Sequence, residues 1–191
     1  MLTGEDVKHK TYSSQQTFSD EPAAQEAFAL SKAKLFNVDG WSDLSLFTAD
    51  FVLYDSIGNP APNRAPRVGD HINIKLPGPT PENWVQVIDV VIENRSAEFT
   101  VRPSKNPQSA EEKGEEIEHF FQSRARSTFR VMVDGCTLTA CEIGQNEAIN
   151  NQDAESGDRT VVNTLIAEAG FLFYQHIQWK ALTDYLVHLE N

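Results

Sequence analysis

The chain is short of cationic side chains and of long apolar runs, and each shortage excludes a class of protein. Only 16 of its 191 residues are lysine or arginine, against 28 aspartates and glutamates, so the formal net charge is −12. Such a charge repels nucleic-acid phosphates and anionic lipid surfaces. No stretch approaches the roughly 18 consecutive apolar residues of a membrane span, and Met1–Lys10 has no apolar run typical of a signal peptide. We therefore expect no nucleic-acid partner, no membrane insertion and a cytoplasmic location.

Cysteine is equally scarce. Cys136 and Cys141 are five residues apart within one expected strand, where an odd spacing sends their side chains to opposite faces, so we predict two buried thiols and no disulfide. Two cysteines and five scattered histidines offer no zinc spacing, and we expect neither a metal nor another cofactor. Nucleophile elbows, phosphate-binding glycine loops and paired-carboxylate signatures are also absent from the sequence, which leaves no positive argument for an enzyme.

The remaining composition is that of a folded globular protein. Hydrophobic residues make up 40% of the chain and charged residues 23%. At this size about 70% of the unfolded surface can be buried, enough for a core that encloses a cavity. Three Pro-rich or polar stretches, residues 59–67, 77–81 and 103–116, are predicted to be loops between strands. None separates two segments with cores of their own, so we predict one domain over residues 10–191, preceded by a loosely ordered segment at 1–9.

The first part of the chain predicts one strand followed by two helices. Lys10–Phe18 alternates loosely and is expected to be a strand. Ser19 or Asp20 can cap a helix that has a proline in its first turn and continues to about Phe36. The apolar spacing within Asn37–Thr48 predicts a second short helix.

The middle of the chain has the texture of antiparallel strands. In Asp70–Leu76 the alternation predicts Ile72 and Ile74 on the inward face and His71 and Asn73 on the outward face. The strand after it is apolar on both faces. The predicted strands of this region are 51–54, 70–76, 84–93 and 97–102.

A long hairpin and a long helix complete the chain. Ile117–Val133 is predicted to be a strand whose odd positions point inward. Asp134–Gly135 predicts a tight turn into a returning strand, Thr137–Ile143, with a bulge at Gly144. Apolar residues then recur on one face of a predicted helix at Asp158–Glu190, about 50 Å long at 1.5 Å per residue. A helix of that length needs a sheet that curls around it.

Several short motifs within this order resemble START-like domains of the SRPBCC superfamily. They are Phe51–Asp55, Val68–Ile74, the turn Leu76–Pro79, Trp84–Val85 and Gly144–Glu147, and the resemblance covers nearly the whole chain. It implies an α+β helix-grip fold, in which a curved antiparallel sheet wraps a long C-terminal helix and two short helices follow the first strand.

The resemblance also implies classes of function. Members of the superfamily hold lipids, polyketides or hormones between sheet and helix, some are cyclases or oxygenase subunits, and some bind chaperones. The Cys/His spacing of the iron-binding relatives is missing here. Our leading hypothesis is therefore binding of a small hydrophobic or aromatic ligand. A cyclase- or hydratase-like enzyme and an interaction module with a collapsed cavity are the alternatives, and a homodimer stays open.

Three residues are the acid/base candidates if the protein is an enzyme: His119, His176 and Glu142. His119 lies on the inward face of the long strand, and His176 on the apolar face of the C-terminal helix, so the two can point at one space; either can equally be a hydrogen-bonded core histidine. Glu142 points inward if Leu138 and Ala140 do, and toward solvent if Cys141 and Ile143 point inward instead. The sequence leaves both parities open.

The inward strand positions and the helix stripe predict the lining of a ligand cavity. The expected residues are Trp84, Phe99, His119, Phe121, Ser123, Phe129, Leu172, His176 and Trp179. The outward face of the long strand carries Arg124, Arg126 and Arg130, which we expect to pair with surface carboxylates such as those of Glu111–Glu118 rather than with an anionic ligand.

Overall fold

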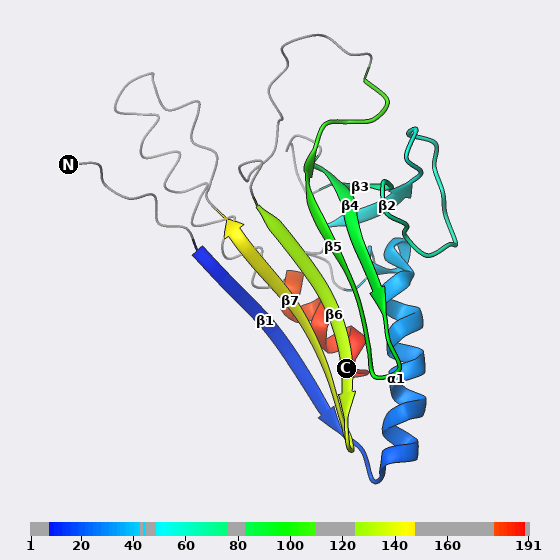
Figure 1. Ribbon diagram of the computed structural model, residues 1–191, viewed down its shortest axis with the longest axis vertical. Helices are drawn as coiled ribbons and strands as arrows, with labels where there is room; N and C mark the ends of the chain where they lie inside the picture. The colour runs from blue at the N-terminus through cyan, green and yellow to red at the C-terminus, as the bar shows by residue number, and fades with distance from the viewer. Residues whose placement is uncertain are drawn as a thin grey trace, which may run out of the picture.

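The computed structural model describes residues 8–42, 44, 49–75, 83–109, 125–147 and 178–189. Their strands form one seven-stranded antiparallel sheet in the order β1-β7-β6-β5-β4-β3-β2 (Figure 1). Apart from the C-terminal helical segment described below, the helices and strands are β1 (Lys8–Thr17), α1 (Glu21–Phe36), the 3-10 helix η1 (Val38–Trp41), β2 (Asp50–Tyr54), β3 (His71–Lys75), β4 (Asn83–Ile92), β5 (Ser96–Ser104), β6 (Arg126–Asp134) and β7 (Thr137–Glu147).

The first strand and helix follow the predicted order. β1 begins at Lys8, two residues before the predicted start, while residues 1–7 lie outside the described part of the chain. Asp20 caps α1, because its Oδ1 accepts a hydrogen bond from the Ala23 N–H at 2.9 Å. Of the predicted second helix, the described residues contain the single turn η1, which ends at Trp41.

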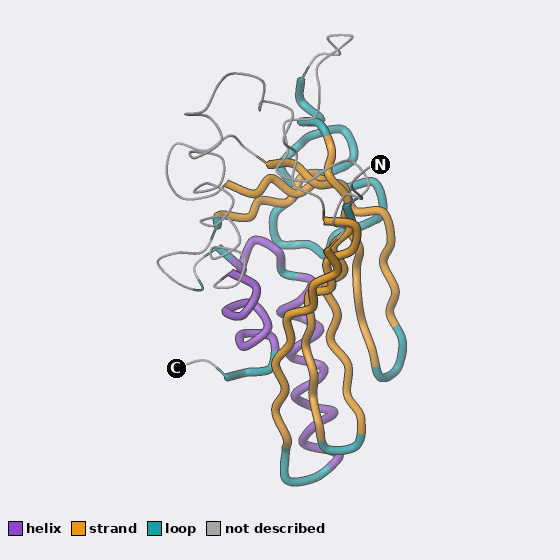
Figure 2. The backbone as a smooth tube through the Cα atoms, turned by 90° about the vertical axis from the view of Figure 1, so that its left-hand side faces the viewer, coloured by secondary structure: helices purple, strands orange, loops and turns teal. Residues whose placement is uncertain are grey.

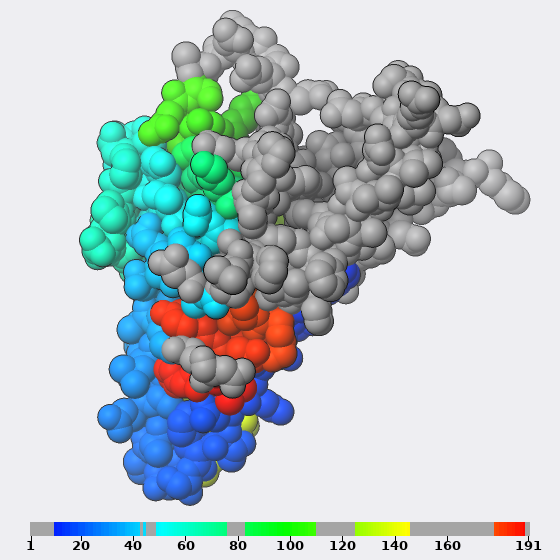
Figure 3. Space-filling model, turned by 180° about the vertical axis from the view of Figure 1, so that it is seen from behind, coloured from blue at the N-terminus to red at the C-terminus, as the bar shows by residue number. Residues whose placement is uncertain are grey.

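Alternate residues of the strands build an inner face that packs against the helices. Figure 2, a view from the β1 edge, shows the strands curving around the side on which the C-terminal helical segment lies. Seen from behind in Figure 3, that segment lies beside α1. The buried core between them includes Ala24, Phe28, Leu35, Trp41, Phe51, Ile72, Val87, Phe99, Phe129, Val131, Leu138, Leu182 and Leu186.

The described part of the C-terminal helix covers residues 178–186, and residues 158–177 lie outside the described residues. The helix ends four residues before the predicted Glu190. His188 adopts a left-handed conformation with φ of 63°, and its N–H donates to the Tyr185 carbonyl at 3.2 Å. The Leu189 N–H donates to the Asp184 carbonyl at 2.9 Å, which completes a Schellman motif and stops the helix. No helix among the described residues is long and apolar enough to cross a membrane.

The strands of the middle region agree with the predicted ones to within two residues at each end, but two side chains face differently from the prediction. His71 and Asn73, predicted outward, are 8% and 7% exposed. Tyr54 pairs with His71 and Trp84 with Asn73, and the two aromatic rings, 4.9 Å apart, cover that face. At this end of the sheet, side chains on the outer face are therefore also buried.

The long hairpin is confirmed where the structure describes it. Ser127, Phe129, Val131 and Val133 alternate on the inner face of β6, as the odd positions predicted, whereas residues 117–124 lie outside the described residues. Gly135 has φ of 54° in the tight turn between β6 and β7, a conformation that glycine adopts without strain.

Candidate functional site

The centre of the inner face is a cluster of aromatic rings. Trp41 lies 5.8 Å from Phe99 and 5.1 Å from Phe129 between ring centroids, and Phe129 lies 5.3 Å from both Phe99 and Trp179. Phe99 and Phe129, predicted to line a cavity, are buried, and Trp179 is partly buried against them. The three predicted residues therefore meet, and in this part of the inner face they pack against one another.

Glu142 lies in the same row of the sheet as these rings. Its strand pairs it with Phe129 on β6 and with Tyr12 on β1, and its side chain shares the inner face with Leu138 and Ala140. Glu142 is 1% exposed. The open question of its parity is thus decided in favour of the inward orientation, which places a buried carboxyl group between two aromatic side chains.

The next row toward the open end of β1 and β7 is more polar. Gly144 pairs with Ser127 on one side and with Lys10 on the other. Gly144 adds no side chain between Ser127 and Lys10, and its backbone is buried. The sequence analysis did not name Lys10 or Tyr12 as site residues. Antiparallel pairing of the predicted first strand with the returning strand of the hairpin would have placed them next to positions 142–144.

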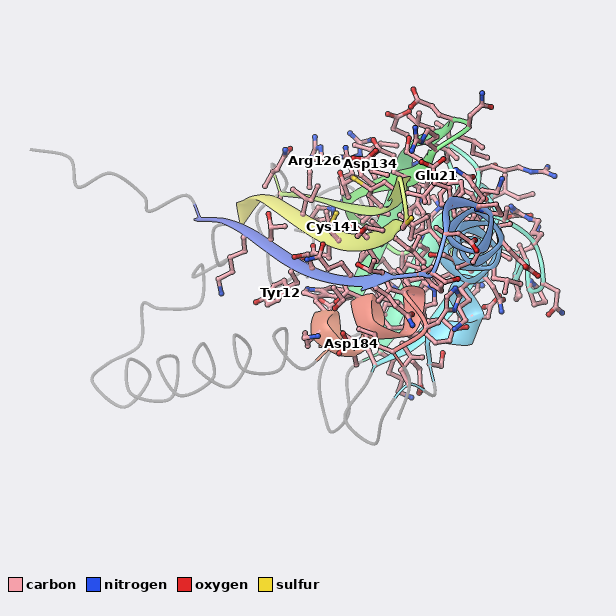
Figure 4. All side chains as sticks on the ribbon, turned by 90° about the horizontal axis from the view of Figure 1, so that it is seen from below. Tyr12, Glu21, Arg126, Asp134, Cys141 and Asp184 are labelled. Carbon is pink, nitrogen blue, oxygen red and sulfur yellow. The ribbon has the colours of Figure 1, made fainter. Side chains whose placement is uncertain are left out.

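The C-terminal helical segment is held over this region by polar contacts. The Ser14 hydroxyl lies 2.8 Å from the Thr183 hydroxyl, donates to Asp184 Oδ1 at 2.6 Å and accepts from Lys180 Nζ at 3.1 Å. In Figure 4, Tyr12 and Asp184 lie on one side of the sheet and Arg126 on the other. These bonds fix the helix on the β1 side of the inner face.

Gln178 fastens the start of the described helical segment at the opposite side. It is 2% exposed, and its Oε1 accepts a hydrogen bond from the Ala49 N–H at 2.7 Å, just before β2. Trp179 follows it and contacts Phe51 at a centroid distance of 6.5 Å as well as Phe129. The helical segment therefore spans from the β1 side to the β2 side of the curved sheet.

The strand register places Trp84 on the opposite face of the sheet from Phe99 and Phe129, the other described strand residues of the predicted cavity lining. Trp84 pairs with Asn73 and Ser104, whereas its neighbour Val85 pairs with Ile72 and Pro103 on the inner face. Trp84 is buried on the outer face against Tyr54. Because β4 is apolar on both parities, its sequence could not distinguish the two faces.

The other predicted site residues lie outside the described residues. They are His119, Phe121, Ser123, Leu172 and His176. A meeting of His119 with His176 therefore stays a prediction.

On the outer face of the sheet, one of the three predicted surface arginines forms an ion pair. Arg130 pairs with the Glu98 carboxylate on β5, in line with the prediction of a surface carboxylate as its partner, and Glu98 raises the pKa of Arg130. Glu111–Glu118 lie outside the described residues. Burial raises the pKa of Cys141 beside the ion pair, which keeps its thiol protonated at neutral pH. Within the described ranges, no three His, Cys, Asp or Glu side chains gather closely enough to hold a metal ion.

No protein-family model matches the chain, and no curated protein matches it either. Among solved structures, the hypothetical protein jhp0584 from Helicobacter pylori matches with a TM-score of 0.56 and 11% identity, over 100% of this chain and 92% of that one. Major latex-like protein 151 from Panax ginseng follows at 0.44, with 12% identity over 96% and 98% of the two chains. Norcoclaurine synthase from Thalictrum flavum, in complex with dopamine and hydroxybenzaldehyde, matches at 0.42, with 13% identity over 100% and 97%. The curved seven-stranded sheet, α1 and the C-terminal helix give this chain an α+β helix-grip fold.

Proposed function

We propose that the protein binds a small hydrophobic or aromatic ligand on the inner face, between the sheet and the C-terminal helix. The observation that carries the proposal is the buried carboxyl group of Glu142 in a row of aromatic side chains. Ligand sites of this kind are lined mostly by apolar groups, with a few polar ones that orient the ligand. Under this proposal the rings of Phe129 and Trp179 contact the apolar body of the ligand, and Glu142 contacts a hydroxyl or amine.

The polarity of Glu142 supports this assignment. A buried carboxyl group requires polar partners for its oxygens, whereas the leucine and alanine at positions 138 and 140 on the same face of β7 require none. Gly144, in the next row at the level of Ser127, adds no side chain. A polar group beside a side-chain-free position suits a ligand better than it suits a close-packed core. His119 and His176 would face the same space if the predicted parities hold.

An acid/base enzyme of the cyclase or hydratase kind is the second candidate. One observation favours it: Tyr12 and Glu142 are direct cross-strand neighbours, so a phenol and a carboxyl group stand side by side. Such a pair can donate and accept a proton at one bound molecule. Turnover, in addition to binding, would distinguish this candidate from a binding protein.

The test is ligand displacement on the intact chain. A fluorescent apolar probe should bind saturably and be displaced by fatty acids or flat aromatic compounds. In Glu142→Gln, affinity for ligands with a hydroxyl or amine should fall about tenfold, the effect of losing one strong hydrogen bond. Affinity for purely apolar ligands should be unchanged.

Glu26→Gln is the matched control, because Glu26 is exposed on α1 and the change is chemically the same. If the folded protein binds no member of a broad panel saturably, ligand binding is wrong and the interaction module with a collapsed cavity replaces it. If Tyr12→Phe and Glu142→Gln abolish turnover of a bound compound, the enzyme reading replaces simple binding.

A further inference from the structure

The sheet is open, and its two edge strands differ in how their outer backbone groups are used. β2 forms one edge and β1 the other (Figure 1). An exposed edge presents unpaired N–H and C=O groups to any chain that can add a strand, and proteins usually protect such edges. The difference between these two edges points to an interaction surface.

The β2 edge is fully capped by its own chain. The Phe51 N–H donates to Ser42 Oγ at 2.9 Å, and the Ser42 hydroxyl donates back to the Phe51 carbonyl at 3.2 Å. The Leu53 N–H donates to Asp39 Oδ1 at 3.1 Å, and the Leu53 carbonyl accepts from the Ala61 N–H at 2.8 Å. Both residues that face away from β3 therefore have partners for N–H and C=O, so this edge has little left to offer another strand.

The β1 edge has the opposite character. β1 is ten residues long against five for β2, and no strand of the described part of the chain pairs with its outer edge. Residues 11–17 contain no charge, no proline and no glycine, and the register irregularity of β1 lies at its beginning, between Lys8 and Lys10. The usual protections of an edge, namely charges, proline, a mid-strand bulge or a short length, are thus missing from the central part of β1.

We propose that β1 pairs antiparallel with β1 of a second copy of this chain, which joins the two sheets into one across a twofold axis. The charge distribution favours this edge over the rest of the surface as the place where two copies meet. With a net charge of −12, two copies repel each other over most of their surface, but β1 carries Lys8 and Lys10 and no acidic residue. The β1 edge is therefore a place where two copies can approach with little repulsion.

Side-chain parity restricts the register of this pairing. Inner-face residues must meet inner-face residues, because Ser14 is buried under the helix while Thr11, Ser13 and Gln15 are exposed on the outer face. A twofold axis at Ser13 satisfies this condition. It places Ser13 opposite its own copy and Lys10 opposite Gln16, with no like charges facing each other. A single pair of strands is a small interface, so we expect a dimer that dissociates on dilution.

The test is a pair of charge variants of the full chain, measured by analytical ultracentrifugation over a range of concentrations. The unmodified chain should dimerise as concentration rises. Ser13→Lys and Ser13→Glu each place two like charges opposite each other and should each be monomeric. An equimolar mixture of the two should form a heterodimer, since the introduced charges are then opposite in sign.

Thr139→Lys is the matched control, because Thr139 shares the outer face but lies on β7, which has neighbours on both sides. It should dimerise like the unmodified chain. Oxidative cross-linking provides a second readout, in a Cys136→Ser, Cys141→Ala background because Cys141 lies directly opposite Ser13 on β7. There, Ser13→Cys should form a covalent dimer, and Val52→Cys at the capped edge should not. A chain that is monomeric throughout the concentration range, a dimer insensitive to Ser13→Lys, or variants that stay monomeric when mixed would each overturn the proposal. It is independent of ligand binding.

Discussion

The two ends of the sheet use their polar side chains differently. At the β2–β3 end, Asp39 and Ser42 bind backbone groups of the edge strand, and Asp55 accepts hydrogen bonds from the N–H groups of Ile57 and Asn59 in the loop that follows. At the β1–β7 end, Ser14 and Glu142 are buried on the inner face. Polar groups at the first end complete backbone hydrogen bonding, whereas those at the second end lie between sheet and helix. The first end therefore stabilises the fold, and the second holds the groups that a ligand would meet.

The loop between β2 and β3 illustrates the first use most clearly. Arg64 binds Asp70 through two hydrogen bonds of 2.6 and 3.0 Å, and the same carboxylate accepts from the Arg67 N–H at 2.7 Å. The Asp70 side chain is 5% exposed. A buried charge with this many partners ties a sixteen-residue connection, residues 55–70, to the start of β3.

The largest change in stability that we expect comes from removing apolar packing at the β2 end. Phe51 is 2% exposed and lies 5.5 Å from Trp41 between ring centroids. Phe51→Ala should lower the free energy of unfolding by about 3–5 kcal/mol. Tyr12→Ala, a change of similar size at the half-buried position on β1, should cost clearly less. Urea denaturation of both variants measures this, and equal losses would remove the distinction between the two ends.

The buried ion pair should have the next largest effect. Asp70→Asn keeps the shape of the side chain but removes its charge, and should lower the free energy of unfolding by about 2 kcal/mol, since it weakens hydrogen bonds to a charged group. The matched control is Asp134→Asn, because the Asp134 side chain is 98% exposed, pairs with Arg95 at 3.4 Å and should contribute little. Thermal unfolding of both should separate them; a larger loss in the control would contradict the importance given to the loop.

At the β1 end, the bonds that hold the helix should each be weaker. Ser14→Ala removes the hydroxyl that contacts Thr183, Asp184 and Lys180 and should cost about 1 kcal/mol. Ser13→Ala, one residue away and exposed, should leave stability nearly unchanged. Hydrogen exchange of residues 178–186 is the sharper measurement, because Ser14→Ala should speed exchange there more than in α1. Uniform acceleration throughout the molecule would mean that Ser14 has no special connection to this helix.

The smallest effect expected is a pH dependence that belongs to the β3 end. Burial lowers the pKa of His71 from its ordinary value of 6.5, against the opposing effects of the Asp55 carbonyl and the nearby Asp70 and Asp55 carboxylates. The unfolded chain therefore takes up a proton at higher pH than the native one. The free energy of unfolding should fall as the pH decreases from about 6.5 toward the lowered value, and this contribution should then level off.

His71→Gln should flatten stability over that interval, which chemical denaturation at several pH values can detect. The Asp55 carboxyl, whose pKa is lowered chiefly by hydrogen bonding to the Asn59 N–H, acts in a separate window below 3.8, where its contribution is lost as acid protonates it. A His71→Gln variant that keeps the full pH dependence around 6 would assign it to another group.

The elements that sequence predicted correctly depend on neighbours along the chain. Asp20 and Pro22 predict the start of α1, and Asp134–Gly135 predicts the β6–β7 turn. Both predictions are local because helix caps and tight turns need particular residues at particular positions. Phe129 was placed inward because β6 alternates regularly. The candidate site was less accessible: Glu142 was named, but its orientation was left open, and Tyr12 beside it was not recognised.

Errors arose where contacts distant in sequence decide the outcome. Trp84 was expected in the ligand cavity because β4 is apolar on both parities, and only its pairing with Asn73 and Ser104 assigns it to the outer face. His71 and Asn73 were expected in solvent, but the Tyr54 and Trp84 rings cover them. The predicted C-terminal helix end failed for a similar reason, since His188 Nε2 lies 3.0 Å from the Ala27 carbonyl of α1.

By itself, the sequence determined the α+β class, the order of the described elements and the inward positions of β6, because these follow from local spacing and capping. Only the tertiary structure decided that Glu142 stands between Tyr12 and Phe129 and that Trp84 lies on the other face from Phe99. It also decided that the β2 edge of the sheet is capped, whereas β1 has no strand of the described part of the chain on its outer side. The physical reason is that the face and the neighbours of a strand residue depend on its register with strands far away in the chain, and a shift of one residue exchanges the two faces.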